Sequence, residues 1–146
     1  MKLRVFLYKP GEAVRQSLPR YIESLGHEVA VINFPQICLK YQSPEDTCSV
    51  TQVCADVIII GTEVPPAKSL AMLEERVAAG CHGAKHNAFI CGDLSDEERQ
   101  RAEAIGCLFL EKPLQLELIG EWLAEVQLQI EQHRELAPFT IGGTAV

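Results

Sequence analysis

The sequence contains no apolar run that approaches the roughly 20 residues needed to cross a bilayer. Its first apolar stretch is interrupted at Lys2 and Arg4, too early for a secretory signal peptide. Basic residues are fewer than acidic ones: the sequence has 13 lysines and arginines and 20 aspartates and glutamates, which gives a net charge of −7. Such a charge opposes the attraction to phosphates that drives nucleic-acid binding. We expect a cytoplasmic protein that contacts neither membranes nor nucleic acid directly.

Paired cysteines are missing as well. None of the six cysteines belongs to a C-x-x-C pair, the tight spacing that is typical of structural zinc sites. Several lie in apolar strand patterns, so buried, reduced thiols and no metal are expected. Zinc or redox chemistry at the soft side chains is the alternative. Its candidates are Cys38, Cys48, Cys54, Cys81, His82, His86 and Cys91.

The sequence also lacks the loops that would hold common cofactors. Gly11 stands alone, without the G-x-G-x-x-G pattern of a dinucleotide site. The loop over residues 8–12 has no serine or threonine for a flavin phosphate, and no aspartate and histidine for a cobalamin. No nucleophile and base can be paired along the chain. We therefore expect no cofactor and no enzymatic activity.

What is present is a regular alternation of strand and helix patterns, with no internal repeat and no linker. Such alternation predicts an α/β fold, a parallel sheet with helices on both faces, in one domain over residues 1–134. A flexible tail is expected over 135–146. Strands are expected at 3–8, 29–33, 57–60, 88–91 and 107–110, and helices over 12–25, 66–80, 96–106 and around 116–130.

Three local features refine these elements. Pro19 predicts a kink or a late start in the first helix, because proline cannot donate to a helical carbonyl. Ser95 and Glu98 form the pattern of a capping box. Residues 35–55 have no clean period, and only a short helix near 49–54 is expected there.

Several landmarks, taken in order, resemble one known family. They are Arg15-x-x-Leu18, Leu25-Gly26, Ala55-Asp56-Val57-Ile58-Ile59 leading to Val64-Pro65, Ala104-Ile105-Gly106 and Lys112-Pro113. Over about residues 3–130 the chain is similar to the receiver domains of two-component response regulators, the CheY-like domains. The resemblance implies a flavodoxin-like sheet of five parallel strands in the order 2-1-3-4-5.

The resemblance also implies that the family's phosphorylation site is degenerate here. The phosphoacceptor aspartate lies four residues before the proline that follows strand three, and that residue is Gly61. The acidic pair that holds magnesium would fall at Lys9-Pro10, and the hydroxyl residue after strand four at Cys91 or Gly92. Only the family's lysine is retained, as Lys112. The chain is thus expected to be a pseudo-receiver that signals without phosphorylation.

The lysine left at this edge leaves several interpretations open. Lys112 is expected to pair with Glu63, Asp93 or Glu12 and to lock the loops. A small-anion or metabolite sensor is the alternative, and its pocket would consist of Lys9, Thr62, Glu63, Asp93 and Lys112. A displaced phosphorylation site that uses Asp93 and Glu63 is a further reading, although ordinary turn chemistry explains Asp93 equally well.

The resemblance also suggests where a partner binds. In receiver domains the face made by helix four, strand five and helix five is the usual surface for dimerisation and signalling. Residues 96–130 form that face here, and a protein partner or a second copy is expected to contact Arg99, Phe109 and Trp122. Trp122 also fits a core position, because tryptophan is favoured in both settings.

Overall fold

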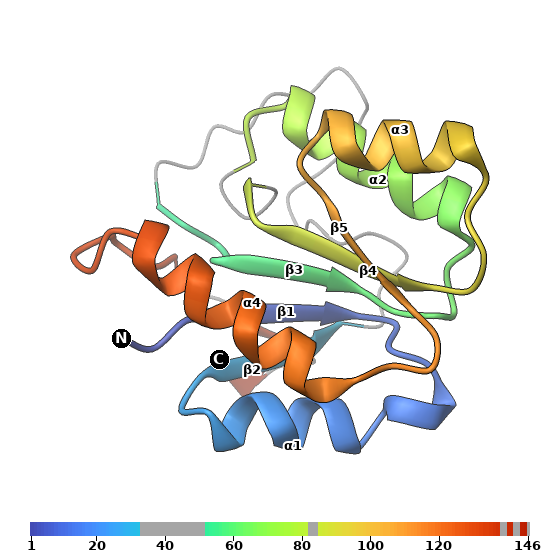
Figure 1. Ribbon diagram of the computed structural model, residues 1–146. Helices are drawn as coiled ribbons and strands as arrows, with labels where there is room; N and C mark the ends of the chain where they lie inside the picture. Colours follow the sequence, from blue (N-terminus) through green and yellow to red (C-terminus); the bar gives the residue numbers. More distant parts are fainter. Residues whose placement is uncertain (33–51, 82–84, 138–139, 142–143, 146) are drawn as a thin grey trace.

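The computed structural model describes residues 1–32, 52–81, 85–137, 140–141 and 144–145. At its centre is a sheet of five parallel strands in the order β2-β1-β3-β4-β5, which confirms the expected order (Figure 1). Each strand lies within one residue of its expected position. The strands are β1 (Arg4–Tyr8), β2 (Glu28–Ile32), β3 (Val57–Ile60), β4 (Asn87–Cys91) and β5 (Leu108–Glu111).

Helices cover both faces of this sheet, as the alternating pattern predicts (Figure 1). They are η1 (Glu12–Val14), α1 (Ser17–Ser24), α2 (Pro66–Ala78), α3 (Asp96–Ala104) and α4 (Leu116–Gln129). The buried side chains of α1 and α4 pack with one face of the sheet, and those of α2 and α3 pack with the other. Among the described residues, no helix is both long enough and apolar enough to cross a membrane.

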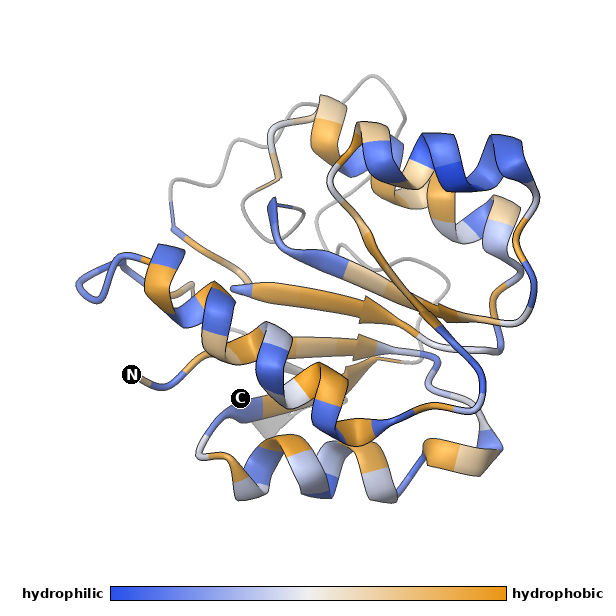
Figure 2. Cartoon of the chain, in the orientation of Figure 1, coloured by the Kyte–Doolittle hydropathy of each residue, from blue (hydrophilic) through white to orange (hydrophobic). Residues whose placement is uncertain are grey.

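The uninterrupted apolar run of β3 follows from its place at the centre of this sandwich (Figure 2). Val57 and Ile59 point to the α1 and α4 side, while Ile58 and Ile60 point to the α2 and α3 side. All four side chains are buried. A strand that is covered on both faces has no reason to alternate apolar with polar residues.

The first helix begins late, one of the two outcomes that Pro19 predicts. A short 3-10 turn, η1, precedes α1, and Ser17 is the first residue of the α-helix. Pro19 therefore lies in the first turn, where a backbone N–H has no partner within the helix and its loss costs little.

The capping box of α3 is confirmed, because Ser95 Oγ accepts from Glu98 N at 3.1 Å and Glu98 Oε1 accepts from Ser95 N at 2.9 Å.

The structure describes parts of two segments that are expected to be irregular. The helix expected near 49–54 is absent over residues 52–54, and residues 49–51 lie outside the described part of the chain. Val53 instead forms a parallel bridge with Leu136. The segment expected to be a loose tail is also docked at its start: Val53 N donates to Glu135 O at 2.8 Å, and Ala137 N donates to Val53 O at 2.9 Å. Beyond it, β6 (Thr140–Ile141) pairs with β7 (Thr144–Ala145).

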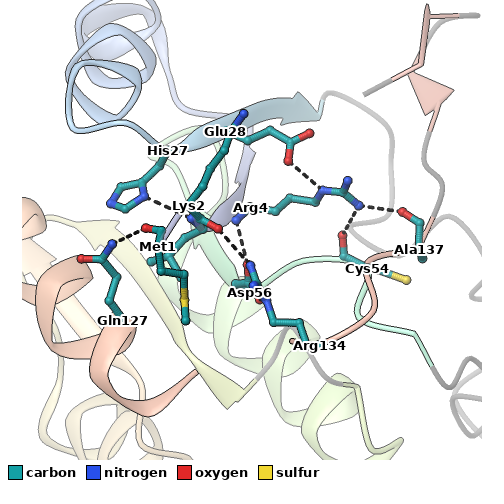
Figure 3. Close-up of polar contacts among 11 residues, drawn as sticks. Met1, Lys2, Arg4, His27, Glu28, Cys54, Asp56, Gln127, Arg134 and Ala137 are labelled. Atoms are coloured by element: carbon teal, nitrogen blue, oxygen red, sulfur yellow. Dashed lines mark hydrogen bonds and ion pairs between the residues drawn. The ribbon is translucent and has the colours of Figure 1, made fainter. Parts of the chain in front are cut away.

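A buried carboxylate holds this docked segment at the amino edge of the sheet (Figure 3). Asp56 precedes β3 and is 1% exposed. Its Oδ2 accepts from the backbone N–H of Arg4 in β1 at 2.8 Å, and Arg134 forms an ion pair and two hydrogen bonds with the same carboxylate. This contact raises the pKa of the Arg134 guanidinium. One side chain thus joins β1, β3 and the chain that follows α4.

The side chain of Arg4 extends the same network. It is 7% exposed, donates from Nε to Glu28 at 3.2 Å, and donates from Nη1 to the carbonyl of Ala137 at 2.7 Å. Nearby, His27 Nδ1 accepts from the backbone N–H of Leu3 at 3.2 Å, which requires that nitrogen to be unprotonated. Burial lowers the pKa of His27 and so favours this neutral form. Arg4, His27 and Asp56 thus each have a polar partner at the amino edge.

Replacing Arg134 should destabilise the fold strongly, because it leaves the Asp56 carboxylate buried without its cation. We expect R134M to lower the free energy of unfolding in urea by about 3–5 kcal/mol. The matched control is R15M, whose exposed pair with Glu12 is worth at most about 1 kcal/mol. Adding D56N to R134M should recover part of the loss, and equal losses for R134M and R15M would contradict the assignment.

Candidate functional site

The loops at the carboxyl ends of β1 and β3 lie directly against each other. Gly61 follows β3, and its backbone N–H donates to the carbonyl of Tyr8 at 2.7 Å. The next residue, Thr62, donates from its backbone to the carbonyl of Pro10 at 3.4 Å. Pro10 and Gly61 are both buried. The pairing of the two strands therefore continues into their loops.

This contact leaves no space for a side chain at position 61. A Cβ added to Gly61 would lie within 2.6 Å of the Lys9 carbonyl oxygen and of the Cα and carbonyl carbon of Pro10. These atoms belong to the backbone of the opposite loop and cannot move aside as the end of a side chain can. The glycine is thus required by its neighbour.

The loop after β1 takes an unusual path to make this approach. Lys9 has a φ of 46° and Gly11 a φ of 91°, both in the left-handed region that L side chains rarely adopt. A Cβ on Gly11 would collide with the Thr62 hydroxyl. The Lys9 ammonium lies 5.6 Å from the centre of the Tyr8 ring, and burial raises the pKa of that phenol. Lys9 therefore lies over its own strand's tyrosine.

The ends of β4 and β5 form a second, separate pair. The backbone N–H of Lys112 donates to the carbonyl of Cys91 at 3.0 Å, and the Lys112–Pro113 peptide bond is cis. Burial, with Glu111 nearby, raises the pKa of the Cys91 thiol to about 11. Gly92 is exposed, and a Cβ added to it would meet nothing within 4 Å. Neither candidate for the family's hydroxyl position offers a reactive oxygen or sulfur at neutral pH.

Lys112 itself is exposed and makes no ion pair with any residue that the structure describes. Of its three expected partners, Glu12 pairs with Arg15 at 3.1 Å, while Glu63 and Asp93 are exposed. The residues of the expected anion pocket follow four neighbouring strands: Lys9 follows β1, Thr62 and Glu63 follow β3, Asp93 follows β4, and Lys112 follows β5. The pocket stays a prediction.

No group of three or more potential metal ligands lies together within the described ranges, which exclude His82, Cys38 and Cys48. Burial also raises the pKa of the Cys107 thiol to about 12. Both Cys91 and Cys107 are therefore protonated and unreactive near neutral pH. These two thiols contribute to the core between the sheet and helices α2 and α3.

The expected interface residues are partly exposed on α3, β5 and α4. Arg99 of α3 donates to Glu111 at 2.7 Å, and its guanidinium lies 5.2 Å from the centre of the Phe109 ring. Trp122 of α4 is half-buried and packs against the core cluster beneath α4. Trp122 therefore packs against the core and also lines a groove, while its place in an interface stays a prediction.

A groove lies beside Trp122, between β5 and α4, with a volume of about 570 Å³. Its lining combines apolar side chains with three glutamates, Glu111, Glu121 and Glu125. Phe109 and Trp122 are among the expected interface residues, whereas these glutamates are not. The sequence does indicate an acidic segment here, because residues 113–133 contain glutamates but no lysine or arginine.

Comparison with known proteins supports the fold. No protein-family model and no curated protein matches this chain. Among solved structures, the non-phosphorylated HemR receiver domain from Leptospira biflexa is similar, with a TM-score of 0.64, 18% identity and coverage of 90% of this chain and 99% of that one. A CheY-like receiver domain protein from Methanospirillum hungatei has a TM-score of 0.60, 15% identity and coverage of 89% and 100%.

The chemotaxis response regulator CheY4 of Vibrio cholerae is a third neighbour, with a TM-score of 0.58, 17% identity and coverage of 86% of this chain and 99% of that one. At these identities the likeness is one of fold. It confirms the expected CheY-like, flavodoxin-like arrangement of five parallel strands.

The close approach at Gly61 predicts that even a methyl group there is costly. We expect G61A to lower the free energy of unfolding by about 1–3 kcal/mol, because the loops must separate to admit the Cβ. The matched control is G92A at the end of β4, where the space is open and the change should be nearly neutral. A G61A variant as stable as G92A in urea unfolding would contradict the contact.

Proposed function

We propose that this protein is a phosphorylation-independent signalling module, a pseudo-receiver that acts by binding another protein and not by catalysis. The receiver-like fold supports a role in two-component signalling. The observation that carries the proposal is the contact at Gly61. The resemblance to receiver domains assigns the phosphoacceptor position to Gly61. The backbone of Lys9 and Pro10 fills the space that a side chain at this position would need.

The chemistry of the neighbouring positions supports the same proposal. Phosphoryl transfer to a protein needs a nucleophilic oxygen and cations that neutralise the charge on the moving group. Gly61 has no side-chain oxygen, and Lys9-Pro10 supplies no carboxylate to hold a hard cation such as Mg²⁺. The Cys91 thiol is buried and protonated. Regulation of this protein would therefore come from its partners and its abundance.

Protein binding is proposed to use the face made by α3, β5 and α4. Arg99, Phe109 and Trp122 are partly exposed there, and a groove lies beside two of them. Aromatic and arginine side chains of this kind are enriched among the residues that contribute most to binding energy. The sheet ends at β5 on this side, so the face also carries a strand edge.

The test is the response to a phosphoryl analogue. We expect that beryllofluoride with magnesium, or acetyl phosphate with magnesium, leaves the amide NMR spectrum unchanged, because no acceptor oxygen faces a metal site. Chemical-shift changes around Gly61, Asp93 and Lys112 would refute phosphorylation independence. Magnesium alone serves as the control for non-specific effects of the cation.

An anion sensor is the second candidate, and the unpaired state of Lys112 among the described residues favours it. A screen of phosphorylated metabolites should then reveal a compound that raises the melting temperature by mass action. The K112A variant should lose that shift, whereas K68A, which removes an exposed lysine from α2, should keep it. The absence of any stabilising compound would reject this candidate.

A further inference from the structure

The groove between β5 and α4 borders the open edge of the sheet. All four residues of β5 line it, together with Leu114, Leu118 and Trp122 from the segment that follows. Leu118 is 48% exposed, which is high for a leucine beside a large aromatic side chain. The groove therefore offers an apolar strip along β5.

The strand that borders this strip has no neighbour on its outer side in the part of the chain that the structure describes. The sheet order ends at β5, and the pairing with β4 accounts for one edge only. An edge strand presents backbone N–H and C=O groups that an extended chain can pair with. Partners that add a strand in this way gain affinity from main-chain hydrogen bonds and specificity from alternate side chains.

The charges around the groove indicate which side chains would fit. Its charged lining residues are Glu111, Glu121 and Glu125, and no lysine or arginine of the described ranges lines it. Glu111 pairs with Arg99, but Glu121 and Glu125 make no ion pair with a described residue. They lie one helical turn apart on α4, a spacing at which like charges repel. A cation between them would relieve that repulsion.

These charges argue against a second copy of the chain as the occupant. A two-fold contact places the same patch on both sides of the interface. It would bring the glutamates of one α4 against those of the other, and α4 contains no lysine or arginine to offset them. Like charges facing each other disfavour a complex. The charges therefore favour a different protein over a second copy of the chain as the partner.

We propose that this groove binds an extended segment of a partner protein that carries lysine or arginine at every second position and pairs with β5 as a sixth strand. In an extended chain, alternate side chains point to the same face. On the α4 side, the aliphatic stems of such residues would cover Leu118 and Trp122, while their cationic ends reach Glu121 and Glu125. This inference rests on the proposed role of the α3–β5–α4 face in protein binding.

The test selects short random peptides on phage against the immobilised full chain. We expect enrichment of peptides with basic residues at alternate positions. The double variant E121K/E125K should weaken a selected peptide at least about tenfold. The control is E117K, which reverses one charge on the same helix outside the groove and should bind as the unchanged chain does; the single variants E121K and E125K match it in charge and should each weaken binding. Circular dichroism checks that each variant is folded.

Backbone pairing is tested separately with N-methylated forms of the selected peptide. In a paired strand, the backbone N–H groups of alternate residues point toward the neighbouring strand. Methylation of the peptide nitrogens that point toward β5 should abolish binding, and methylation of the nitrogens between them should not. Uniform tolerance of N-methylation, selection of peptides with helical spacing, or no enrichment at all would overturn the proposal.

Failure of the groove proposal can be distinguished from failure of the proposed function. A dimer seen by light scattering and lost in W122A would overturn the peptide groove but keep the interaction face. A response to beryllofluoride would refute phosphorylation independence and leave the groove untouched.

Discussion

The carboxyl edge of this protein depends on one backbone contact, the approach of the loop after β1 to Gly61. Two parallel strands normally diverge into loops that leave a crevice for ligands. Here the hydrogen bonds continue past the strand ends, from Gly61 to Tyr8 and from Thr62 to Pro10. The positive φ angles of Lys9 and Gly11 follow from the path that this pairing demands. The main chain of Lys9 and Pro10 therefore fills the space beside Gly61.

The amino edge is organised by the opposite means. There the chain buries ionised side chains and satisfies each one: Asp56 with Arg134 and the Arg4 backbone, and Arg4 with Glu28 and the carbonyl of Ala137. Buried ion pairs are costly to form and more costly to break singly, so they specify one arrangement of the elements that they join. These elements include the segment after α4, which is thereby fixed to the first strand.

The sequence predicts the elements of this fold better than their contacts. The order of five strands follows from apolar runs that alternate with helical spacing, and Pro19 and Ser95 mark helix starts through local chemistry. The contact at Gly61 was not predictable, because the sequence shows a missing aspartate but not the neighbouring loop that excludes it. The docking of residues 135–137 on Val53 was missed for the same reason, since it joins positions far apart in the chain. The expected partners of Lys112 failed because exposed charges are weakly constrained by sequence.

The distribution of charge explains how an open strand edge and a binding face can coexist. Eight acidic and three basic residues lie within 96–130, and two of the three basic side chains are paired inside the molecule, Arg99 with Glu111 and Arg101 with Glu74. Exposed strand edges invite unwanted pairing, and proteins counter this with short edge strands and charge. β5 has only four residues and ends on a glutamate. The acidic helix beside it repels a second copy of itself, yet the same charge attracts a basic segment. In the proposed binding mode, protection from self-association and selection of a partner therefore arise from one set of glutamates.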